Sequence, residues 1–292
     1  MIFKYKNGNR LITINPSTGD KKRYKQIGSQ AYKPVRPENI DLNLSYKCNL
    51  GCSFCYLNAT PGKQVFNFDE EFLENLFKDD LVGLEIAMNL NDEPITGSHI
   101  ALVKYLKNKN YIPNFTINYL TLKSKIDTYE FKQLKPYWWG VSVNSLTQIQ
   151  NILKLVKDKS NISKNNIVFH IINGVFNPKE FIKIPKDVKV LVLGYKNLGR
   201  GVAFSPPYNF LTVQNIEQKG GNISFDNLAI KQIKDIETLP NFDLNYLGDD
   251  GEHSFYIDLV NKTFSKSSTD KLNNFKLGNK SVNECFKEVR NG

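Results

Sequence analysis

The sequence predicts an α/β fold: a partial (β/α)6 TIM-like barrel with an N-terminal β-hairpin and a C-terminal α+β extension. Six short apolar runs alternate with longer amphipathic segments, which is typical of parallel strands joined by crossover helices. A closed barrel of eight units usually takes about 250 residues. Only six units precede residue 202 of this 292-residue chain, so we expect the barrel to stay open.

The barrel elements follow one another in a regular order. The expected strands are Ile40–Leu44, Gly83–Leu90, Asn114–Leu122, Trp138–Asn144, Ile167–Ile172 and Lys189–Tyr195. The expected helices between them are Asp69–Asp79, Ser98–Lys109, Thr128–Leu134 and Leu146–Lys157, with a shorter one around Pro178–Phe181. Apolar positions in these helical segments recur at the 3.6-residue period of an amphipathic helix.

The two ends of the chain have other patterns. Met1–Tyr5 and Leu11–Ile14 flank Asn7-Gly8, a strong signal for a hairpin turn. A polar stretch with Pro34 and Pro37 then predicts an extended lead-in up to the barrel.

The last ninety residues form the expected extension. They predict a helix over Asp226–Ile236, a second hairpin from His253–Leu259 and Lys262–Ser265, and a short helix over Ser281–Val289. The expected division of the chain is therefore 1–39, 40–201 and 202–292.

Composition excludes some classes of protein. With 40% apolar and 12% aromatic residues, the chain can fill a core. The longest apolar run, Val188 to Tyr195, is far shorter than the roughly 20 residues that span a bilayer. No signal peptide is evident, and we expect a cytoplasmic protein without a membrane partner. A net charge of +10 makes nucleic acid a possible partner, but only five of 39 basic residues are arginines, so it is not favoured.

Three cysteines lie close together directly after the first barrel strand. Cys48, Cys52 and Cys55 have the spacing C-x3-C-x2-C. Parallel barrels place their active sites at the carboxyl ends of the strands, where this loop begins. Three thiolates can bind three corners of a cubane [4Fe-4S] cluster and leave the fourth iron open. The alternatives are unrelated thiols or zinc, but zinc prefers four ligands and no matching pair is present. Cys285 is isolated, which predicts an ordinary thiol and no second cluster.

The cysteine spacing, with the aromatic Phe54 before the last cysteine, resembles the signature of the radical S-adenosylmethionine (SAM) superfamily. The resemblance implies a [4Fe-4S] cluster whose open iron binds the amino and carboxylate groups of SAM. One electron, from a flavodoxin- or ferredoxin-type reductant, would then yield methionine and a 5′-deoxyadenosyl radical that abstracts hydrogen from a substrate. Phrases such as Ile112-Pro-Asn-Phe-Thr116 are also similar to small radical SAM proteins common in phage genomes, whose substrates are unknown.

Further positions match that superfamily at later strand ends. Asn91-Asp92-Glu93-Pro94 stands where the family has Gly-Gly-Glu-Pro, which implies that Glu93 contacts the amino group of SAM. An ordinary acidic turn is the alternative reading. Ser142 and Asn144 share one face by the period of two, and the resemblance places them near the ribose or the methionine carboxylate. The alternative, almost as well supported, is that Ser142 and Asn144 are ordinary polar residues of the turn at the end of the strand.

The fifth and sixth strands carry the remaining candidates. The resemblance implies that Asn173 and the backbone at Gly194 lie near the adenine, so that they shape the cofactor pocket together with Phe54. His170 is a candidate for cofactor binding or proton relay, although interior histidines are more often structural. Lys196 and Arg200 are candidates for holding a substrate, or are surface charges.

These expectations favour an enzyme that abstracts hydrogen from a peptide or protein side chain. Modification of a nucleotide or nucleic-acid base is an alternative, and so is cleavage of SAM for its own sake. From another class, the chain would be a non-catalytic iron-sulfur binding or sensor protein.

Overall fold

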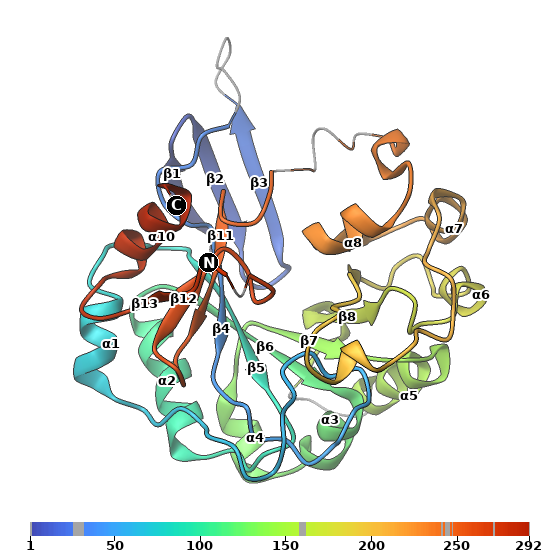
Figure 1. Ribbon diagram of the computed structural model, residues 1–292, viewed down its shortest axis with the longest axis horizontal. Helices are drawn as coiled ribbons and strands as arrows, with labels where there is room; N and C mark the ends of the chain where they lie inside the picture. Colours follow the sequence, from blue (N-terminus) through green and yellow to red (C-terminus); the bar gives the residue numbers. More distant parts are fainter. Residues whose placement is uncertain are drawn as a thin grey trace.

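The computed structural model describes residues 2–25, 32–157, 162–240, 242, 246, 248–270 and 272–291. Its strands form a small antiparallel sheet and one large curved sheet, and Figure 1 shows helices around the outside of the curve. The small sheet contains β1 (Phe3–Asn7), β2 (Arg10–Asn15) and β3 (Asp20–Lys25). In the described chain no helix has the length and apolar character needed to cross a membrane.

The large sheet has the order β10-β9-β8-β7-β6-β5-β4-β11-β12-β13. The strands are β4 (Asn39–Asn43), β5 (Glu85–Leu90), β6 (Ile112–Asn118), β7 (Trp138–Ser142), β8 (Ile167–Ile172), β9 (Val190–Leu193), β10 (Ile223–Phe225), β11 (Ser254–Asp258), β12 (Thr263–Ser265) and β13 (Phe275–Lys276). Every pairing from β10 across to β11 is parallel, whereas β12 and β13 are antiparallel. This is the expected partial TIM-like barrel.

Helices connect the parallel strands and cover their outer face. They are α1 (Glu70–Leu76), α2 (Gly97–Asn108), α3 (Tyr119–Lys125), α4 (Tyr129–Leu134), α5 (Leu146–Lys157), α6 (Pro178–Phe181), α7 (Val213–Lys219), α8 (Asn227–Gln232) and α10 (Val282–Asn291). Apolar side chains of α1, α2 and α5 join those of the strands in one core, and packing of such amphipathic faces is what stabilises short helices.

The two faces of the parallel sheet differ in polarity. On β5, the outward-facing Ile86, Met88 and Leu90 are at most 1% exposed, whereas Glu85 and Asn89 on the other face are partly exposed. The same alternation runs through β6, β7 and β8. Polar or charged inner-face residues are Asn39, Asp41, Glu85, Asn89, Asn114, Thr116, Asn118, Ser142 and His170. The inside of this barrel is therefore polar and accessible instead of being a packed apolar core.

The small sheet closes the end of the barrel at which the parallel strands begin. Arg23 on β3 donates to both carboxylate oxygens of Glu38, just before β4, at 2.8–3.2 Å. Lys21 on β3 bonds Glu85 at the start of β5, with 2.8 Å between Nζ and Oε2. Burial alone would raise the pKa of Glu38, but the neighbouring Lys21 and Arg23 cations lower it to about 2. These ion pairs fix the small sheet to the starts of β4 and β5.

The six expected strands and the helices between them are confirmed, with ends that differ by a few residues. The strand expected over Asn114–Leu122 stops at Asn118 and is followed by α3. The side chain of Asn118 accepts the N–H of Leu120 at 2.8 Å, which starts a helix where the apolar pattern alone suggested continued strand.

Two expectations at the ends of the chain were wrong in detail. The expected lead-in contains β3, because Lys21 and Arg23 on one face of this polar strand have carboxylate partners; its residues 26–31 lie outside the described residues. The helix expected over Asp226–Ile236 ends at Gln232, since Ile233 is extended and Asp235 is left-handed with φ of +59°.

The C-terminal segment contributes to the barrel sheet itself. The second hairpin is confirmed as β11 and β12. In addition, β11 pairs in parallel with β4, and β10 pairs in parallel with β9. The sheet thus has eight consecutive parallel strands in the described chain, two more than expected.

Candidate active site

The three clustered cysteines lie on the long loop that joins β4 to α1. This loop folds back on itself through backbone hydrogen bonds: Cys48 donates to Thr60 at 3.2 Å, and Thr60 donates to Tyr46 at 3.0 Å. Cys55 donates to Cys52 at 3.2 Å, which closes a tight turn between the last two cysteines. All three thiols are free and half-buried. The sequence prediction that they sit at the carboxyl end of β4 is confirmed.

The thiols influence one another electrostatically. Burial, followed by the neighbouring Cys48 and Cys55, raises the pKa of the Cys52 thiol. Metal binding must therefore displace a proton from Cys52. Within the described residues, no three His, Cys, Asp or Glu side chains are grouped to hold a single metal ion. A cubane cluster differs from a single ion because each thiolate binds a different iron atom.

Glu93 lies after β5 with 1% of its surface exposed. Its Oε2 accepts a hydrogen bond of 2.6 Å from Ser45, directly after β4. Its Oε1 lies 3.7 Å from Nε2 of His99, and neither of these two atoms has a hydrogen-bond partner among the described residues. A buried carboxylate oxygen without a donor is costly, so this oxygen is suited to a donor brought by a ligand.

The loops around Glu93 and the cysteines are tied together by amide side chains. Asn91 Nδ2 donates to the carbonyl of Ser45 at 2.9 Å, and Asn49 Nδ2 donates to the carbonyl of Asp92 at 2.7 Å. Asn91 and Asp92 stand where the resemblance would have glycines. The Asn91 side chain thus connects the two loops, whereas Asp92 contributes its backbone carbonyl.

Ser142 and Asn144 are both accessible at the end of β7. Ser142 is half-exposed on the inner face of the barrel, and Asn144 is exposed beyond the strand end. The backbone N–H of Asn144 donates to Gln148 Oε1 at 2.8 Å, which shapes the turn into α5.

Asn173 and Gly194 follow β8 and β9. Asn173 is buried, and its Oδ1 accepts from Leu211 N at 2.8 Å, while its Nδ2 has no partner among the described residues. The N–H of Gly194 donates to Asp226 Oδ1 at 2.9 Å. A Cβ at Gly194 would lie 2.4 Å from the Leu228 side chain, so helix packing by itself requires glycine there.

His170 faces the inside of the barrel from β8. Its ring covers Gly140 of β7, where a Cβ would lie 2.4 Å from ring atom Cε1. Burial lowers the pKa of His170 to about 4, and its Nδ1 is buried without a partner in the described structure. The imidazole is therefore neutral at pH 7.

The two cations after β9 are both engaged within the protein. Lys196 Nζ donates to Ser268 Oγ at 2.8 Å and lies 4.1 Å from the centre of the Tyr56 ring. Burial opposes its charge, but Tyr56 and nearby carboxylates outweigh this and raise the pKa of Lys196. Arg200 donates to backbone carbonyls of the cysteine loop. The structure thus brings both residues to the cysteine loop rather than leaving them free at the barrel mouth.

Phe54 also contacts the segment that follows β9. Its ring contacts Phe204 edge-on, with 5.6 Å between ring centres. Phe204 belongs to the segment after β9. An aromatic contact therefore joins this segment to the cysteine loop, in addition to the hydrogen bonds of Arg200.

Sequence reasoning missed Ser45 and His99, the two neighbours of Glu93. Ser45 offered no signal, because a serine after a strand is ordinary. For His99 the sequence offered a weak signal, the spacing Thr96-x-x-His99 at the start of an amphipathic segment. In the structure the two residues form a capping box, in which the His99 ring accepts the N–H of Thr96 at 3.2 Å.

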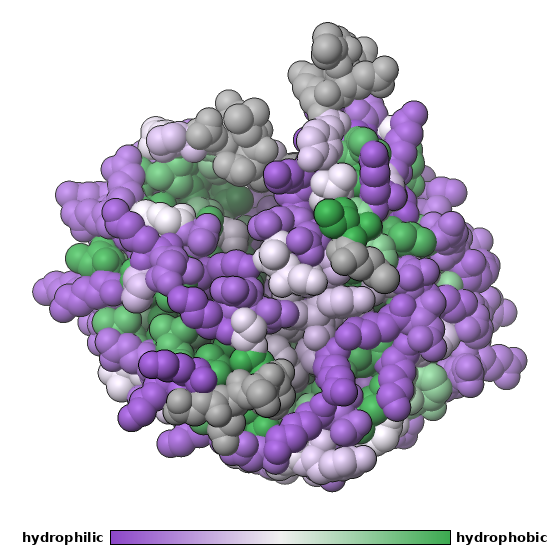
Figure 2. Space-filling view, turned by 180° about the vertical axis from the view of Figure 1, so that it is seen from behind, coloured by the Kyte–Doolittle hydropathy of each residue, from purple (hydrophilic) through white to green (hydrophobic). Residues whose placement is uncertain are grey.

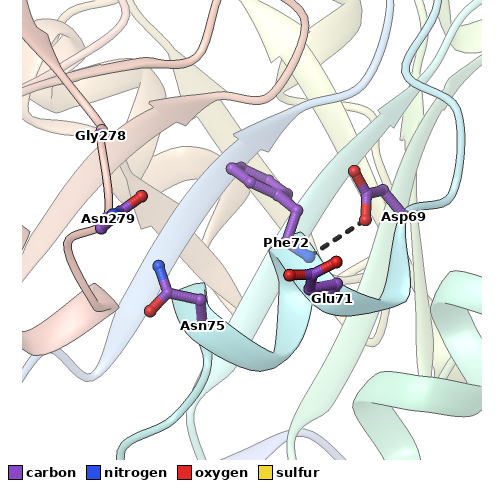
Figure 3. Close-up of a pocket in the computed structure, with 6 residues that line it drawn as sticks. All are labelled: Asp69, Glu71, Phe72, Asn75, Gly278 and Asn279. Atoms are coloured by element: carbon purple, nitrogen blue, oxygen red, sulfur yellow. Dashed lines mark hydrogen bonds between the residues drawn. The ribbon is translucent and has the colours of Figure 1, made fainter.

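A separate hollow lies outside the barrel, between α1 and the turn after β13 (Figure 3). Asp69, Glu71, Phe72 and Asn75 line it from one side, and Gly278 and Asn279 from the other. Asp69 is already occupied as the cap of α1, accepting Phe72 N at 3.1 Å. None of the candidate residues lines this hollow.

The architecture is similar to that of solved structures. The crystal structure of Streptococcus suis SuiB bound to S-adenosylmethionine superposes with a TM-score of 0.57 over 90% of this chain and 80% of SuiB, at 12% identity. The chain has the SuiB fold. SuiB bound to its precursor peptide SuiA gives 0.55 at 12% identity, and SuiB alone gives 0.53 at 11% identity, each over 90% of this chain and 81% of SuiB. No family model matches the sequence, and no curated protein matches it either.

Proposed function

We propose that the protein is a radical SAM enzyme that abstracts hydrogen from a peptide or protein side chain. The observation that carries the proposal is the position of three free thiols on one loop at the carboxyl end of β4, in a fold shared with a protein crystallised with S-adenosylmethionine. When bound, a [4Fe-4S] cluster and SAM supply a 5′-deoxyadenosyl radical.

The residues of the site fit these groups. Cys48, Cys52 and Cys55 would ligate three irons, because all three thiols are free and share a short loop. The free Oε1 of Glu93 would accept a hydrogen bond from the amino group of SAM, a charge-assisted contact. The free Nδ2 of Asn173 is a donor for the adenine.

Other residues would complete the pocket. Phe54, Ser142, Asn144 and the backbone at Gly194 would shape it, and neutral His170 would face it as a polar, uncharged neighbour. A flavodoxin- or ferredoxin-type protein would supply the electron, and the net charge of +10 suits an acidic partner.

A peptide substrate is favoured over a nucleotide. SuiB binds a precursor peptide within the same fold, and the polar inside of this barrel suits a polar peptide group. On the face shown in Figure 2, hydrophilic side chains spread over the surface instead of gathering in one place. Only five of the 39 basic residues are arginines, which is more typical of a solvated surface than of a nucleic-acid track.

The remaining expectations are part of the same proposal. The chain would act in the cytoplasm and would be related to the small phage-type radical SAM proteins. Residues 40–201 would carry the chemistry, with 1–39 closing the barrel and 202–292 completing its sheet.

The test is anaerobic reconstitution with iron and sulfide, reduction by dithionite, and chromatography for 5′-deoxyadenosine. We expect about four irons and four sulfides per chain, and product that depends on reductant. A variant with Cys48, Cys52 and Cys55 changed to alanine should lose both, whereas Cys285→Ala, which removes a thiol buried in the core, should keep both. A wild-type sample that binds zinc, or no metal, would refute the proposal.

The same assay separates the alternatives. Stimulation of 5′-deoxyadenosine formation by a peptide pool supports the peptide substrate, and stimulation only by an oligonucleotide pool supports the nucleic-acid alternative. Full activity without any addition indicates cleavage of SAM itself. A bound cluster with no product under any condition indicates a sensor.

A further inference from the structure

The segment that follows β9 lies directly against the cysteine loop. Arg200, in the 3-10 turn Gly199–Val202, makes contacts with this loop from 148 residues away in sequence. Its backbone N–H donates to the carbonyl of Cys55 at 3.1 Å, and its Nε donates to the carbonyl of Cys52 at 2.8 Å. Its Nη1 donates to the carbonyl of Ala59 at 2.9 Å and lies 3.3 Å from Asn58 Oδ1.

The glycines on either side make this approach possible. A Cβ at Gly199 would lie 2.6 Å from the carbonyl oxygen of Tyr56, and this residue has a φ of +56°. A Cβ at Gly201 would lie 2.6 Å from the carbonyl oxygen of Lys196. The chain therefore brings backbone against backbone here, and the residue between the two glycines extends into the cysteine loop.

One side chain thus satisfies carbonyl groups at several points of a loop that has no helix or strand across its cysteines. The planar guanidinium is suited to this because its donors form a rigid fork, whereas a lysine offers a single flexible point. Fixing a loop in this way before a ligand arrives lowers the ordering cost of binding. The contacts also place a permanent positive charge next to Cys52.

We propose that Arg200 is a positioning residue for the iron-sulfur site: it holds the carbonyls of Cys52, Cys55 and Ala59 so that the thiols keep their binding geometry, and its charge favours reduction of the cluster. This inference rests on the proposed function. Reduction adds one electron from dithionite or the protein reductant, with no bond formed or broken, and makes the cluster one charge more negative. A cation beside Cys52 stabilises the more negative state.

Three variants test the inference, with Arg290→Gln as the matched control, because Arg290 donates to the Pro34 carbonyl at a distance from the cysteine loop. Arg200→Gln removes the charge and the fork, and Arg200→Lys keeps only the charge. Gly199→Ala keeps the arginine but pushes its segment away from Tyr56.

The first measurement uses metal-free protein and does not depend on the cluster. Lys63 is an exposed trypsin site within the cysteine loop. Cleavage after Lys63 is followed by mass spectrometry. We expect it to be roughly tenfold faster in Arg200→Gln and Gly199→Ala than in the wild type, because loss of the Arg200 contacts raises the fraction of molecules in which the loop is open. Equal rates in the wild type, Arg200→Gln and Gly199→Ala would overturn the positioning role.

The second and third measurements use reconstituted protein. Iron release to a chelator should be several-fold faster in all three Arg200 and Gly199 variants and unchanged in Arg290→Gln. The reduction equilibrium of Arg200→Gln should move about tenfold towards the oxidised state, which is about 59 mV for one electron, while Arg200→Lys stays near the wild type. A potential that does not change in Arg200→Gln would overturn the electrostatic part.

Failure of the proposed function gives a different pattern. Wild-type protein would then take up no iron-sulfur cluster, while the proteolysis still reports whether Arg200 holds the loop. If Arg200→Gln does not fold, Arg200→Lys and Gly199→Ala decide the matter by the same cleavage and iron-release rates.

Discussion

His99 Nε2 lies 3.7 Å from Glu93 Oε1, with both side chains almost completely buried. The Nδ1 of the same ring accepts the N–H of Thr96 at 3.2 Å, so in the neutral ring the proton is on Nε2 and faces the carboxylate. Ser45 donates to the other carboxylate oxygen at 2.6 Å. Ser45 therefore holds one oxygen of the Glu93 carboxylate before any ligand binds, while the other oxygen faces the His99 N–H beyond hydrogen-bond distance.

This arrangement predicts that Glu93→Gln weakens binding of SAM. The expected increase in Kd is roughly tenfold or more, because a hydrogen bond to a charged group contributes about 1.5–3 kcal/mol. His99→Leu should weaken binding by less, and His99→Gln should restore part of the loss since an amide N–H can replace Nε2–H. Calorimetry on the reconstituted protein measures this. Glu74→Gln, on the exposed side of α1, is the control, and a wild-type Kd in Glu93→Gln would contradict the role given to Glu93.

The ion pairs of Glu38 predict a pH dependence of stability. Its pKa falls from the usual 4.5 to about 2, so the folded state retains a charge that the unfolded chain loses first. The stabilisation, roughly 3 kcal/mol, is complete above pH 4.5 and is lost as the pH falls through about 2. Glu38→Gln should lower the free energy of unfolding by about this amount at pH 7 and by much less at pH 2. Urea titrations at the two pH values check it, and an equal loss at both would show that the charge is not responsible.

The half-buried imidazole of His170 predicts that acid lowers stability here too, but in a higher pH range. Because burial lowers its pKa to about 4, the folded state keeps it neutral while the unfolded chain takes up a proton near pH 6.5. Acidification from pH 6.5 to 4 therefore favours unfolding. The ring nitrogen signals of His170 in NMR spectra should stay constant from pH 8 to pH 5.5 and change only near pH 4. A midpoint near 6.5 would mean that the ring is not buried against Gly140.

A substitution at Gly194 can show whether this residue is needed for helix packing or for cofactor binding. Gly194→Ala should destabilise the metal-free protein by about 1–3 kcal/mol, because the new methyl group meets both the side chain and the backbone of Leu228. Leu228→Ala in the same chain should recover only part of this loss, since the backbone contact remains. Thermal denaturation of the metal-free variants checks the expectation. Unchanged stability combined with weakened SAM binding would point instead to direct contact with the cofactor.

Local patterns were sufficient to predict most of the barrel. The six middle strands and their helices appear in the sequence as apolar runs and 3.6-residue periods, and the Cys48-x3-Cys52-x2-Cys55 spacing identified the loop that the structure places at the end of β4. The strands differ from the expectation in one respect. We expected covered, apolar strands, but Asn89, Thr116 and other inner-face residues are polar because the barrel is open and accessible inside.

The rest depended on contacts between distant parts of the chain. β3 is a polar strand that forms because Arg23 and Lys21 make ion pairs with Glu38 and Glu85. A local sequence pattern does not predict such partners. β10 has three residues, too few to display a period. Lys196 and Arg200 were candidates for holding a substrate or were surface charges; the sequence could not show their partners, Ser268 and the carbonyl of Cys52, because these lie 72 and 148 residues away.

The pairing of β11 with β4 has a consequence for the order in which the molecule is completed. Asn43, at the end of the strand that leads into the cysteines, hydrogen-bonds Asp258 at 3.3 Å, across 215 positions of sequence. During synthesis, β4 remains an unpaired edge on one side until residues 254–258 have left the ribosome, and contacts this far apart form slowly. The proposed cluster would therefore assemble in a finished chain, because a nascent one would carry its three thiols on an unsupported loop.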